Sequence, residues 1–246
     1  SGALKVLIPK SKSKYAEAVL INTGGGIVGG DNLSIEVEAA KKTNSELYVA
    51  TPDQKVIDVV NQNRGKAVLT STDHQTGTDR IYEVFKDHLK SEPNLIINLQ
   101  GDMPNMEPQP ISDLINYMQK GNCDIGTLAS SFSSDDEIAN ENNVKVAVKD
   151  QLTAGKFSEA IDFFRVDEKK YENYHHHVGI YAFTNKALVR YVSLKRSKLE
   201  LERKLEQLRA LENSMSIHVG YINSSPLSVD TKNDLMEVRK IMEKSN

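Results

Sequence analysis

Two aspartates stand where they could bind a metal ion. Asp102 follows Asn94–Leu99, the clearest apolar segment of the chain, and Asp230 precedes the last segment of helical period. Mg2+ prefers oxygen ligands and is often held by only one or two protein carboxylates. Each aspartate alone is also typical of a turn or a helix N-cap. As a pair, Asp102 and Asp230 predict a magnesium site.

A polar segment, Asp73–Arg80, places many hydrogen-bonding side chains around one turn-forming residue, Gly77. It follows the apolar run Ala67–Thr70 and precedes a helical pattern, which is where α/β proteins bind their ligands. Thr78 could be an N-cap, and that would explain part of the pattern. The number of polar side chains indicates contact with a ligand.

Three lysines provide positive charge near the start of the chain. Lys10, Lys12 and Lys14 follow the predicted strand Leu4–Ile8 and the strand-ending Pro9. Ammonium groups at this point are well placed to hold a triphosphate. A solvated charged loop explains the same spacing equally well.

A glycine-rich stretch, Gly24–Gly29, fits the G-x-G-x-x-G pattern and follows a possible strand, Ala18–Asn22. A dinucleotide-binding turn of this type must also open a helix and be followed by an acid about 20 residues later. Here Asp31 follows at once, and Leu33–Glu38 alternates like a strand. The stretch is therefore interpreted as a flexible loop or hairpin, with phosphate binding by its backbone amides as the alternative.

Three consecutive histidines, His175–His177, resemble a zinc-binding set. Neighbouring residues of a strand point to opposite faces, so the three imidazoles cannot share one metal ion. The chain has a single cysteine and no H-x-x-x-H helix to add ligands. Contact of one histidine with a substrate is therefore favoured over metal binding.

The elements that must position these residues alternate between strand and helix in the first half of the chain. The expected strands are Leu4–Ile8, Glu46–Ala50, Ala67–Thr70 and Asn94–Leu99. The expected helices are roughly Ile35–Thr43, Lys55–Asn63 and Thr78–Lys90. This alternation predicts βαβ units with a mostly parallel sheet, whose ligands lie beyond the carboxyl ends of the strands.

The second half of the chain is less regular. Its expected strands are Val144–Val148, which should be half-exposed, Val178–Phe183 and Ile217–Tyr221. Its expected helices are Lys186–Val192, Leu199–Leu211 and Lys232–Glu243. We predict one α/β domain over residues 1–246, with a β-rich elaboration over about residues 140–190.

Composition excludes several classes of partner. The 246 residues carry 31 basic and 34 acidic side chains, and a net charge of -3 does not suit binding to nucleic acid. No apolar run approaches the roughly 18 residues of a membrane span. The single cysteine, Cys123, cannot form an internal disulfide and suits a reducing compartment, so a cytoplasmic protein is expected.

Five motifs, taken in order, resemble those of one family. They are Thr72–Arg80, Asn98–Asp102, His177–Tyr181, Leu205–Arg209 and Val229–Thr231. The series is similar to that of the CMP-Kdo synthetases, the 3-deoxy-D-manno-octulosonate cytidylyltransferases, from about Ser45 to the C-terminus. The resemblance implies a Rossmann-like nucleotidyltransferase fold, a mostly parallel sheet flanked by helices, and a homodimer. It implies transfer of CMP from CTP to Kdo, or to a close 3-deoxy sugar acid such as 8-amino-Kdo, for lipopolysaccharide synthesis.

The same resemblance implies roles for individual residues. Asp102 and Asp230 would bind Mg2+. Lys10, expected from its position after the first strand, completes the predicted catalytic set. The sugar acid would be held by Gln100, His177, Tyr181, Glu206 and Gln207. The nucleotide would be held by His74, Gln75, Thr76, Gly77 and Arg80. Lys10, Lys12 and Lys14 are expected to hold its triphosphate because of their position after the first strand, and this expectation does not come from the resemblance.

The chain departs from the family's pattern at several positions. Residues 10–31 lack the expected Arg and Pro-Gly-Lys, Met103 replaces an acid, and Glu159 replaces an Arg. A catalytically impaired paralogue that binds nucleotide or sugar is therefore one alternative. A dinucleotide-dependent oxidoreductase that uses Gly24–Gly29 is the other.

Overall fold

The computed structural model describes residues 3–5, 17–22, 34–36, 46–89, 93–103, 106, 108–166, 171–229, 236 and 240. The chain divides into two compact units, Ser1–Ser112 together with Pro226–Asn246, and Asp113–Ser225. This division does not test whether the two units act as one domain, so the single domain remains a prediction.

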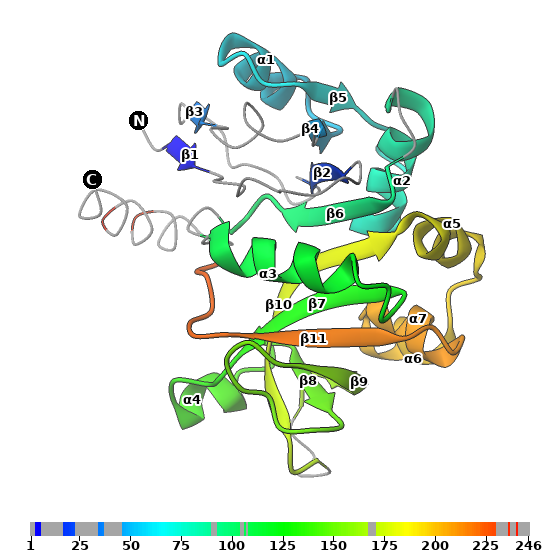
Figure 1. The fold of residues 1–246 in the computed structure, drawn as a ribbon. Coiled ribbons are helices and arrows are strands. Elements are labelled where there is room, and N and C mark those ends of the chain that lie inside the picture. The colour runs from blue at the N-terminus through cyan, green and yellow to red at the C-terminus, as the bar shows by residue number, and fades with distance from the viewer. Residues whose placement is uncertain are drawn as a thin grey trace. The chain divides into compact units, whose positions relative to one another are not determined.

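Four parallel strands form the sheet of the first unit (Figure 1). Their order is β5 (Ala67–Leu69), β4 (Glu46–Thr51), β2 (Glu17–Asn22) and β6 (Leu95–Gln100). The first five residues of β6 are buried, as its apolar sequence predicts for a strand covered on both faces.

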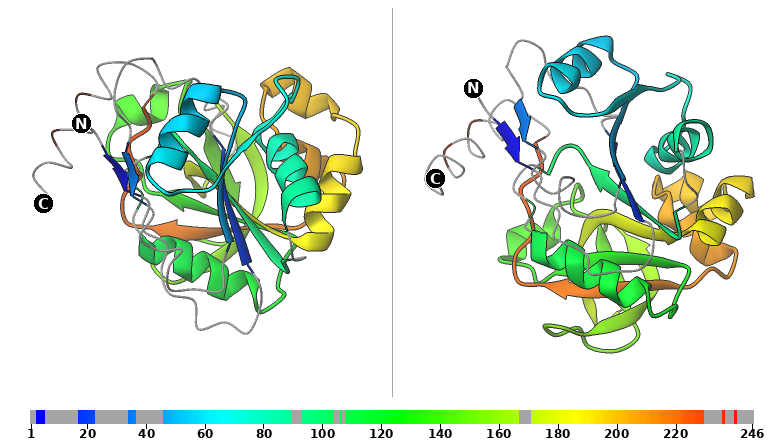
Figure 2. Two further views of the ribbon diagram at one scale, coloured as in Figure 1. Left: turned by 90° about the horizontal axis from the view of Figure 1, so that it is seen from above. Right: turned by 45° about the horizontal axis from the view of Figure 1, so that its top comes forward.

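Two helices connect these strands and lie beside them (Figure 2). α1 (Gln54–Gln62) contacts β4 and β5, and α2 (Gly77–His88) contacts β2, β4 and β6. Both helices and the strands β4, β5 and β6 agree with the sequence prediction to within two residues at each end.

The first strand lies elsewhere than the sequence predicts. β1 (Ala3–Lys5) pairs in parallel with β3 (Ser34–Glu36) in a separate two-stranded sheet, while β2 takes the place between β4 and β6. The predicted helix Ile35–Thr43 is therefore wrong at its start. The runs Leu4–Ile8 and Ala18–Asn22 are both apolar enough to form a strand. Their pairing decides which of them lies between β4 and β6.

The second unit contains five hydrogen-bonded strands and short helices. The strand order is β10 (Tyr174–Thr184), β7 (Ile125–Ser130), β11 (Ile217–Ile222), β9 (Phe157–Phe164) and β8 (Lys145–Val148). β8 also pairs with β10, so the sheet curls round on itself. The helices are α3 (Pro108–Met118), which leads into the unit, α4 (Asp135–Ala139), α5 (Asn185–Ser193), α6 (Lys198–Arg203) and α7 (Gln207–Glu212).

Two predictions for this unit are wrong. All four residues of β8 are buried rather than half-exposed, because β8 pairs on both edges, with β9 and with β10. The single helix Leu199–Leu211 is two helices, because Lys204 has left-handed backbone angles (φ 55°, ψ 44°) and ends α6. The predicted helix Lys232–Glu243 lies almost entirely outside the described residues.

Within the described ranges, none of the helices is both long enough and apolar enough to cross a membrane.

Candidate active site

The carboxyl ends of the parallel strands meet at one edge of the first unit's sheet. Asn22, the last residue of β2, lies in register with Ala50 of β4 and with Gln100 of β6. Leu69, the last residue of β5, lies in register with Thr51 of β4. The segments that leave these strands therefore start from a common edge, the usual ligand-binding edge of such sheets.

Asp102 lies at this edge and contacts the C-terminal part of the unit. The backbone N–H of Val229 donates to the carbonyl oxygen of Asp102 at 2.9 Å. Ser228 Oγ donates to Asp102 Oδ2 at 3.3 Å. The chain is thereby held against Asp102 up to the residue before Asp230. Asp230 itself lies outside the described residues, so its sharing of a metal ion with Asp102 remains a prediction.

The donors at this edge fit Mg2+ by their chemistry. The carboxylate of Asp102 and the hydroxyl of Ser228 are hard oxygen donors, and Mg2+ needs few protein ligands. Met103, which replaces an expected acid, is buried and adds no oxygen. Among the residues that the structure describes, no three His, Cys, Asp or Glu side chains are grouped to hold a metal ion.

The segment between β5 and α2 is held in place by its own side chains. Thr76 is the N-cap of α2, and its hydroxyl accepts from the N–H of Asp79 at 3.2 Å. The interpretation of Thr78 as the cap is therefore wrong by two residues. Thr78 is a buried residue in the first turn of α2. Gly77 begins the helix directly after this cap, so the helix starts within the polar segment that follows β5.

Arg80 of α2 holds the start of this segment through hydrogen bonds to Thr70 and Ser71. Its Nη1 donates to Thr70 Oγ1 at 2.6 Å and to the carbonyl of Ser71 at 3.0 Å. Burial lowers the pKa of Arg80, which is 5% exposed. His74 hydrogen-bonds Glu83 of α2, while Gln75 is exposed. Contact of these residues with a nucleotide remains a prediction.

The three lysines and the glycine-rich stretch lie outside the described residues. Lys10, Lys12 and Lys14 come between β1 and β2 in the chain, whereas Gly24–Gly29 follows the carboxyl end of β2. The glycine-rich stretch is thus the segment that directly follows β2 in the chain. Binding of a triphosphate by the lysines remains a prediction.

In the second unit, an irregularity of β10 brings His177 and Tyr181 together. Val178 pairs with Leu128 of β7 and Tyr181 pairs with the adjacent Thr127, so β10 carries two additional residues between them. Residues four apart in a regular strand are about 13 Å apart. Here the rings of His177 and Tyr181 have centroids 5.5 Å apart.

His177 is buried against the neighbouring strand. Its Nε2 lies 2.9 Å from Thr127 Oγ1, and its ring meets Phe163 edge-on at 5.1 Å. Burial lowers the pKa of His177 to about 3, and the nearby His176 acts in the same direction. The imidazole is therefore neutral, and one ring nitrogen offers a lone pair.

Glu206 lies beside Tyr181 at the start of α7. Burial raises the pKa of Tyr181 well above its usual value, and the negative charge of Glu206 adds to this. Tyr181 is thus a neutral hydrogen-bond donor next to a carboxylate. The hydroxyl of Tyr191 donates to the carbonyl oxygen of Glu206 at 2.9 Å and fixes its backbone. Gln207, the first residue of α7, is buried.

A buried ion pair fixes the turn between α6 and α7. Arg209 donates from Nε and Nη2 to the two carboxylate oxygens of Glu200, at 2.9 and 2.7 Å. Arg196 donates to the same carboxylate at 2.8 Å. The Arg209 guanidinium lies 4.5 Å from the ring centroid of Tyr191. These contacts hold Glu206, which lies between the two helices.

The structure thus places Tyr181 near both His177 and Glu206, and Gln207 follows Glu206 as the first residue of α7. Gln100 belongs to the first unit, and its predicted approach to this group remains a prediction. The adjacent His176 has a different partner, as alternation predicts, and its Nδ1 lies 2.6 Å from Glu137 Oε1. The His175 ring lies edge-on to Tyr221.

Glu159, where the family pattern has an arginine, is a surface residue of β9. Half of its side chain is exposed, and it forms an ion pair with Lys149 at 3.7 Å. It also lies opposite His218 on β11. Exposure and the paired lysine weaken any repulsion of an anionic ligand by this carboxylate.

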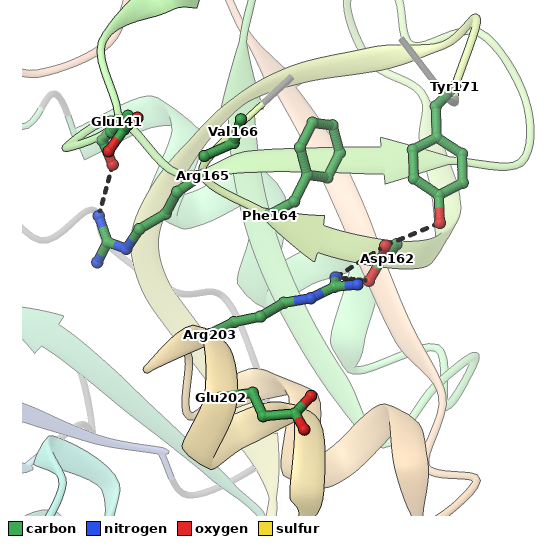
Figure 3. Close-up of a pocket in the computed structure, with 8 residues that line it drawn as sticks. All are labelled: Glu141, Asp162, Phe164, Arg165, Val166, Tyr171, Glu202 and Arg203. Carbon is green, nitrogen blue, oxygen red and sulfur yellow. Dashed lines mark hydrogen bonds and ion pairs between the residues drawn. The ribbon is translucent and has the colours of Figure 1, made fainter. Parts of the chain in front are cut away.

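A cavity of about 290 Å³ in the second unit has none of the predicted site residues among those that line it (Figure 3). Arg203 of α6 reaches across it to Asp162 of β9, with Nη1 2.8 and 2.9 Å from the two carboxylate oxygens. Tyr171 donates to the same carboxylate at 2.8 Å. The carboxylate of Asp162 is thus paired within the protein, and the location of the chemistry around His177 remains a prediction.

The low pKa of His177 predicts a pH dependence of stability. The unfolded chain takes up a proton near pH 6.5 that the folded protein accepts only near pH 3. The contribution of His177 to stability is thus complete above about pH 6.5 and is lost as the pH falls towards 3, by at most about 1.4 kcal/mol per pH unit. NMR of the ring should show no titration of His177 between pH 5 and pH 8. A midpoint near 6.5 would contradict the buried, neutral state.

Several residues that build the group were not singled out from the sequence. They are Thr127, Tyr191 and Glu200, which act through contacts with residues distant in sequence. The signals that pointed to this region were the motif Leu205–Arg209 and the predicted helix Leu199–Leu211, and neither of them indicates the ion pair between Glu200 and Arg209.

Comparison with known proteins places the chain among nucleotidyltransferases. A family model for cytidylyltransferases matches residues 33–217, more than half of the chain. The 3-deoxy-manno-octulosonate cytidylyltransferase of Sinorhizobium medicae (strain WSM419) is 39% identical over 206 residues, covering 83% of this chain and 82% of that protein. The enzyme of the same name from Rhizobium meliloti (strain 1021) is 37% identical over 249 aligned positions, covering 98% of this chain and 96% of that protein. The chain belongs to the 3-deoxy-manno-octulosonate cytidylyltransferase family.

A solved structure supports the same family. CMP:2-keto-3-deoxy-manno-octonic acid synthetase, complexed with CTP, matches with a TM-score of 0.78 at 29% identity and covers 95% of this chain and 100% of that chain. The predicted α/β nucleotidyltransferase fold is thereby confirmed.

The N-terminal segment has a second likeness. A family model described as UreD urease accessory protein matches residues 1–55, which include the three lysines and the glycine-rich stretch. The next described residues after that stretch, Ser34–Glu36, form a strand, whereas a dinucleotide-binding turn opens a helix. The oxidoreductase interpretation therefore loses its support.

Proposed function

We propose that this protein transfers the CMP group of CTP to the anomeric hydroxyl of 3-deoxy-manno-octulosonate and releases pyrophosphate. The observation that carries the proposal is similarity to 3-deoxy-manno-octulosonate cytidylyltransferases over 98% of the chain. The polar group around His177 and Tyr181, which suits a ligand rich in hydroxyl groups, gives independent support. The product would serve lipopolysaccharide synthesis.

The reaction is an exchange of one phosphorus–oxygen bond for another. The anomeric oxygen forms a bond to the α-phosphorus of CTP, the bond from that phosphorus to the β-phosphate oxygen breaks, and the hydroxyl proton is released. No covalent bond to the protein forms, so most of the rate would come from positioning the two substrates. Tyr181 would donate to the sugar acid, whereas His177 and the carboxylate of Glu206 would accept from its hydroxyl groups.

Mg2+ belongs to the proposal as the cofactor. Asp102 and Asp230 would hold it, and when bound it would neutralise charge on the triphosphate and align it. The hard oxygen donors at Asp102 and Ser228 support this assignment. The adjacent polar segment, from His74 to Arg80, would hold the cytidine side of CTP.

We also propose that the protein is a homodimer in the cytoplasm. In the second unit, Ile161, Val166 and Leu201 are about half exposed, and large apolar side chains at a surface are typical of association. Cys123 is a free, buried thiol, which suits a reducing compartment.

A pyrophosphate-release assay tests the proposed function. The purified protein is supplied with CTP, Mg2+ and Kdo, and each component is omitted in turn. Release that needs all three supports the proposal. CTP and Kdo that bind to the protein without release of pyrophosphate would instead identify a catalytically impaired paralogue.

Glu206→Ala should separate the two substrates. We expect the KM for Kdo to rise by about 10- to 100-fold, because a charge-assisted hydrogen bond is lost, while the KM for CTP stays within about twofold. Glu202→Ala is the matched control and should change neither value, because Glu202 is an exposed residue of α6 that forms an ion pair with Lys198 at 3.7 Å. An equal rise of the KM values for Kdo and CTP in Glu206→Ala would contradict the role of Glu206 in the sugar site.

A further inference from the structure

We propose that Thr127 is a positioning residue that holds His177 as its Nε2–H tautomer, so that Nδ1 accepts a hydrogen bond from a hydroxyl group of the sugar acid. The identity of the ligand rests on the proposed function. The tautomer rests on the hydrogen bonds of this buried threonine.

The hydroxyl of Thr127 has one proton and three neighbours. Thr127 Oγ1 lies 2.7 Å from the carbonyl oxygen of Ile180, 3.3 Å from that of Val178 and 2.9 Å from His177 Nε2. Both carbonyls can only accept, so the hydroxyl proton is directed to Ile180, the nearer of the two. The remaining contact needs a proton from the imidazole, which means that His177 Nε2 is the donor.

The irregularity of β10 makes this arrangement necessary. Between Val178 and Tyr181 the strand leaves its regular pairing with β7, so the carbonyl of Ile180 loses its usual partner in the sheet. Ile180 and Thr127 are both 0% exposed, and a buried carbonyl without a donor costs about 1–3 kcal/mol. The threonine hydroxyl supplies that donor, and the same irregularity brings His177 and Tyr181 together.

The tautomer decides what His177 can recognise. A neutral imidazole with its proton on Nε2 has its lone pair on Nδ1, so it accepts a proton and cannot donate one from that atom. Burial keeps the pKa of His177 at about 3, so a doubly protonated ring does not compete. Nδ1 of His177 and the carboxylate of Glu206 can each accept a hydrogen bond from a hydroxyl group of the sugar. The hydroxyl of Tyr181 can donate a hydrogen bond to an oxygen of the sugar acid.

The test compares two substitutions at this position. Thr127→Val keeps the shape but removes the hydroxyl, and Thr127→Ser keeps the hydroxyl. We expect 15N NMR of the free wild-type protein to show His177 with its proton on Nε2, and Thr127→Val to show a mixture of both tautomers. The KM for Kdo should rise about tenfold in Thr127→Val, with the KM for CTP unchanged, and Thr127→Ser should restore both the tautomer and the KM.

Ser130→Ala is the matched control. Ser130 lies on the same strand and is 0% exposed, but its hydroxyl has no hydrogen-bond partner in the described part of the chain. Its loss should leave the His177 tautomer and both KM values unchanged. The inference is overturned if Thr127→Val retains the Nε2–H tautomer, or if Thr127→Ser fails to restore the wild-type values.

The tautomer is measured without substrate, so it separates this inference from the proposed function. A wild-type protein that releases no pyrophosphate would overturn the proposed function, while the NMR comparison would still decide the role of Thr127. Conversely, an active enzyme whose His177 carries its proton on Nδ1 would overturn the inference alone.

Discussion

Asp102→Asn should abolish nearly all turnover and leave the protein folded. The substitution keeps the size of the side chain and its bond to Ser228, but it removes the negative charge at the end of β6. If that charge holds Mg2+ against the triphosphate, its loss costs on the order of 4 kcal/mol in the transition state, which is about a thousandfold in kcat. Steady-state kinetics at saturating CTP and Kdo, over a range of Mg2+ concentrations, measure this effect.

Asp58→Asn is the control for charge and fold. Asp58 is an exposed residue of α1 in the same unit and accepts a hydrogen bond from Gln54 at 2.8 Å. It should retain wild-type kcat, and circular dichroism should show the same melting temperature for both variants. An Asp102→Asn enzyme within about threefold of wild-type kcat would show that this carboxylate does not hold the metal ion.

Glu200→Gln should strongly destabilise the protein. Glu200 is 0% and Arg209 2% exposed, so loss of the carboxylate charge leaves a buried guanidinium without its counter-ion. Breaking a buried pair from one side costs about 3–5 kcal/mol. For a chain of this length, that corresponds to a fall in melting temperature of roughly 10 °C. Thermal unfolding monitored by circular dichroism checks this.

The control for this pair lies two residues away. Glu202→Gln removes an exposed carboxylate from the same helix, and an exposed ion pair contributes at most about 1 kcal/mol. A melting temperature of Glu200→Gln equal to that of Glu202→Gln would mean that the Glu200–Arg209 pair does not stabilise the fold.

The stabilisation by Glu200 also has a defined pH window. Burial acts to raise the pKa of Glu200, but hydrogen bonds from Arg209 and Arg196 outweigh it and leave the pKa below its usual value. The folded state therefore binds the proton less readily than the unfolded chain. The contribution of the pair is complete above about pH 4.3 and is lost as the pH falls through the pKa of the folded state.

The parallel sheet was predictable because its strands are short apolar runs. β4, β5 and β6 are rich in Val, Ile and Leu. Such continuous apolar runs are typical of parallel strands that are covered on both faces. β7 was missed because Gly126 and Thr127 interrupt its pattern. Gly126 is required there, since a Cβ atom would lie 2.7 Å from side chains of Leu114 and Met118. That constraint comes from packing against α3, so it cannot be predicted from the residues next to Gly126 in the sequence.

The candidate site was predictable where it depends on single motifs. His177, Tyr181 and Glu206 follow from the family resemblance, but their convergence follows from an irregular strand and a left-handed Lys204 that divides one helix into two. Neither feature has a local signal, because His177–Tyr181 reads as a regular strand and Leu199–Leu211 as a continuous amphipathic helix. The supporting residue Thr127 is visible only once β7 and β10 are paired.

The most direct test of the central claim is detection of the product itself. The protein is incubated with CTP, Mg2+ and Kdo, the CMP-linked sugar acid is quantified by mass spectrometry, and the pyrophosphate is measured in the same sample. The Rhizobium meliloti relative serves as the positive control. We expect CMP-Kdo and pyrophosphate in equal amounts, with none of either when Kdo is omitted. Absence of a CMP-linked sugar acid, under conditions in which the relative forms one, would contradict the assignment of this chain as an active cytidylyltransferase.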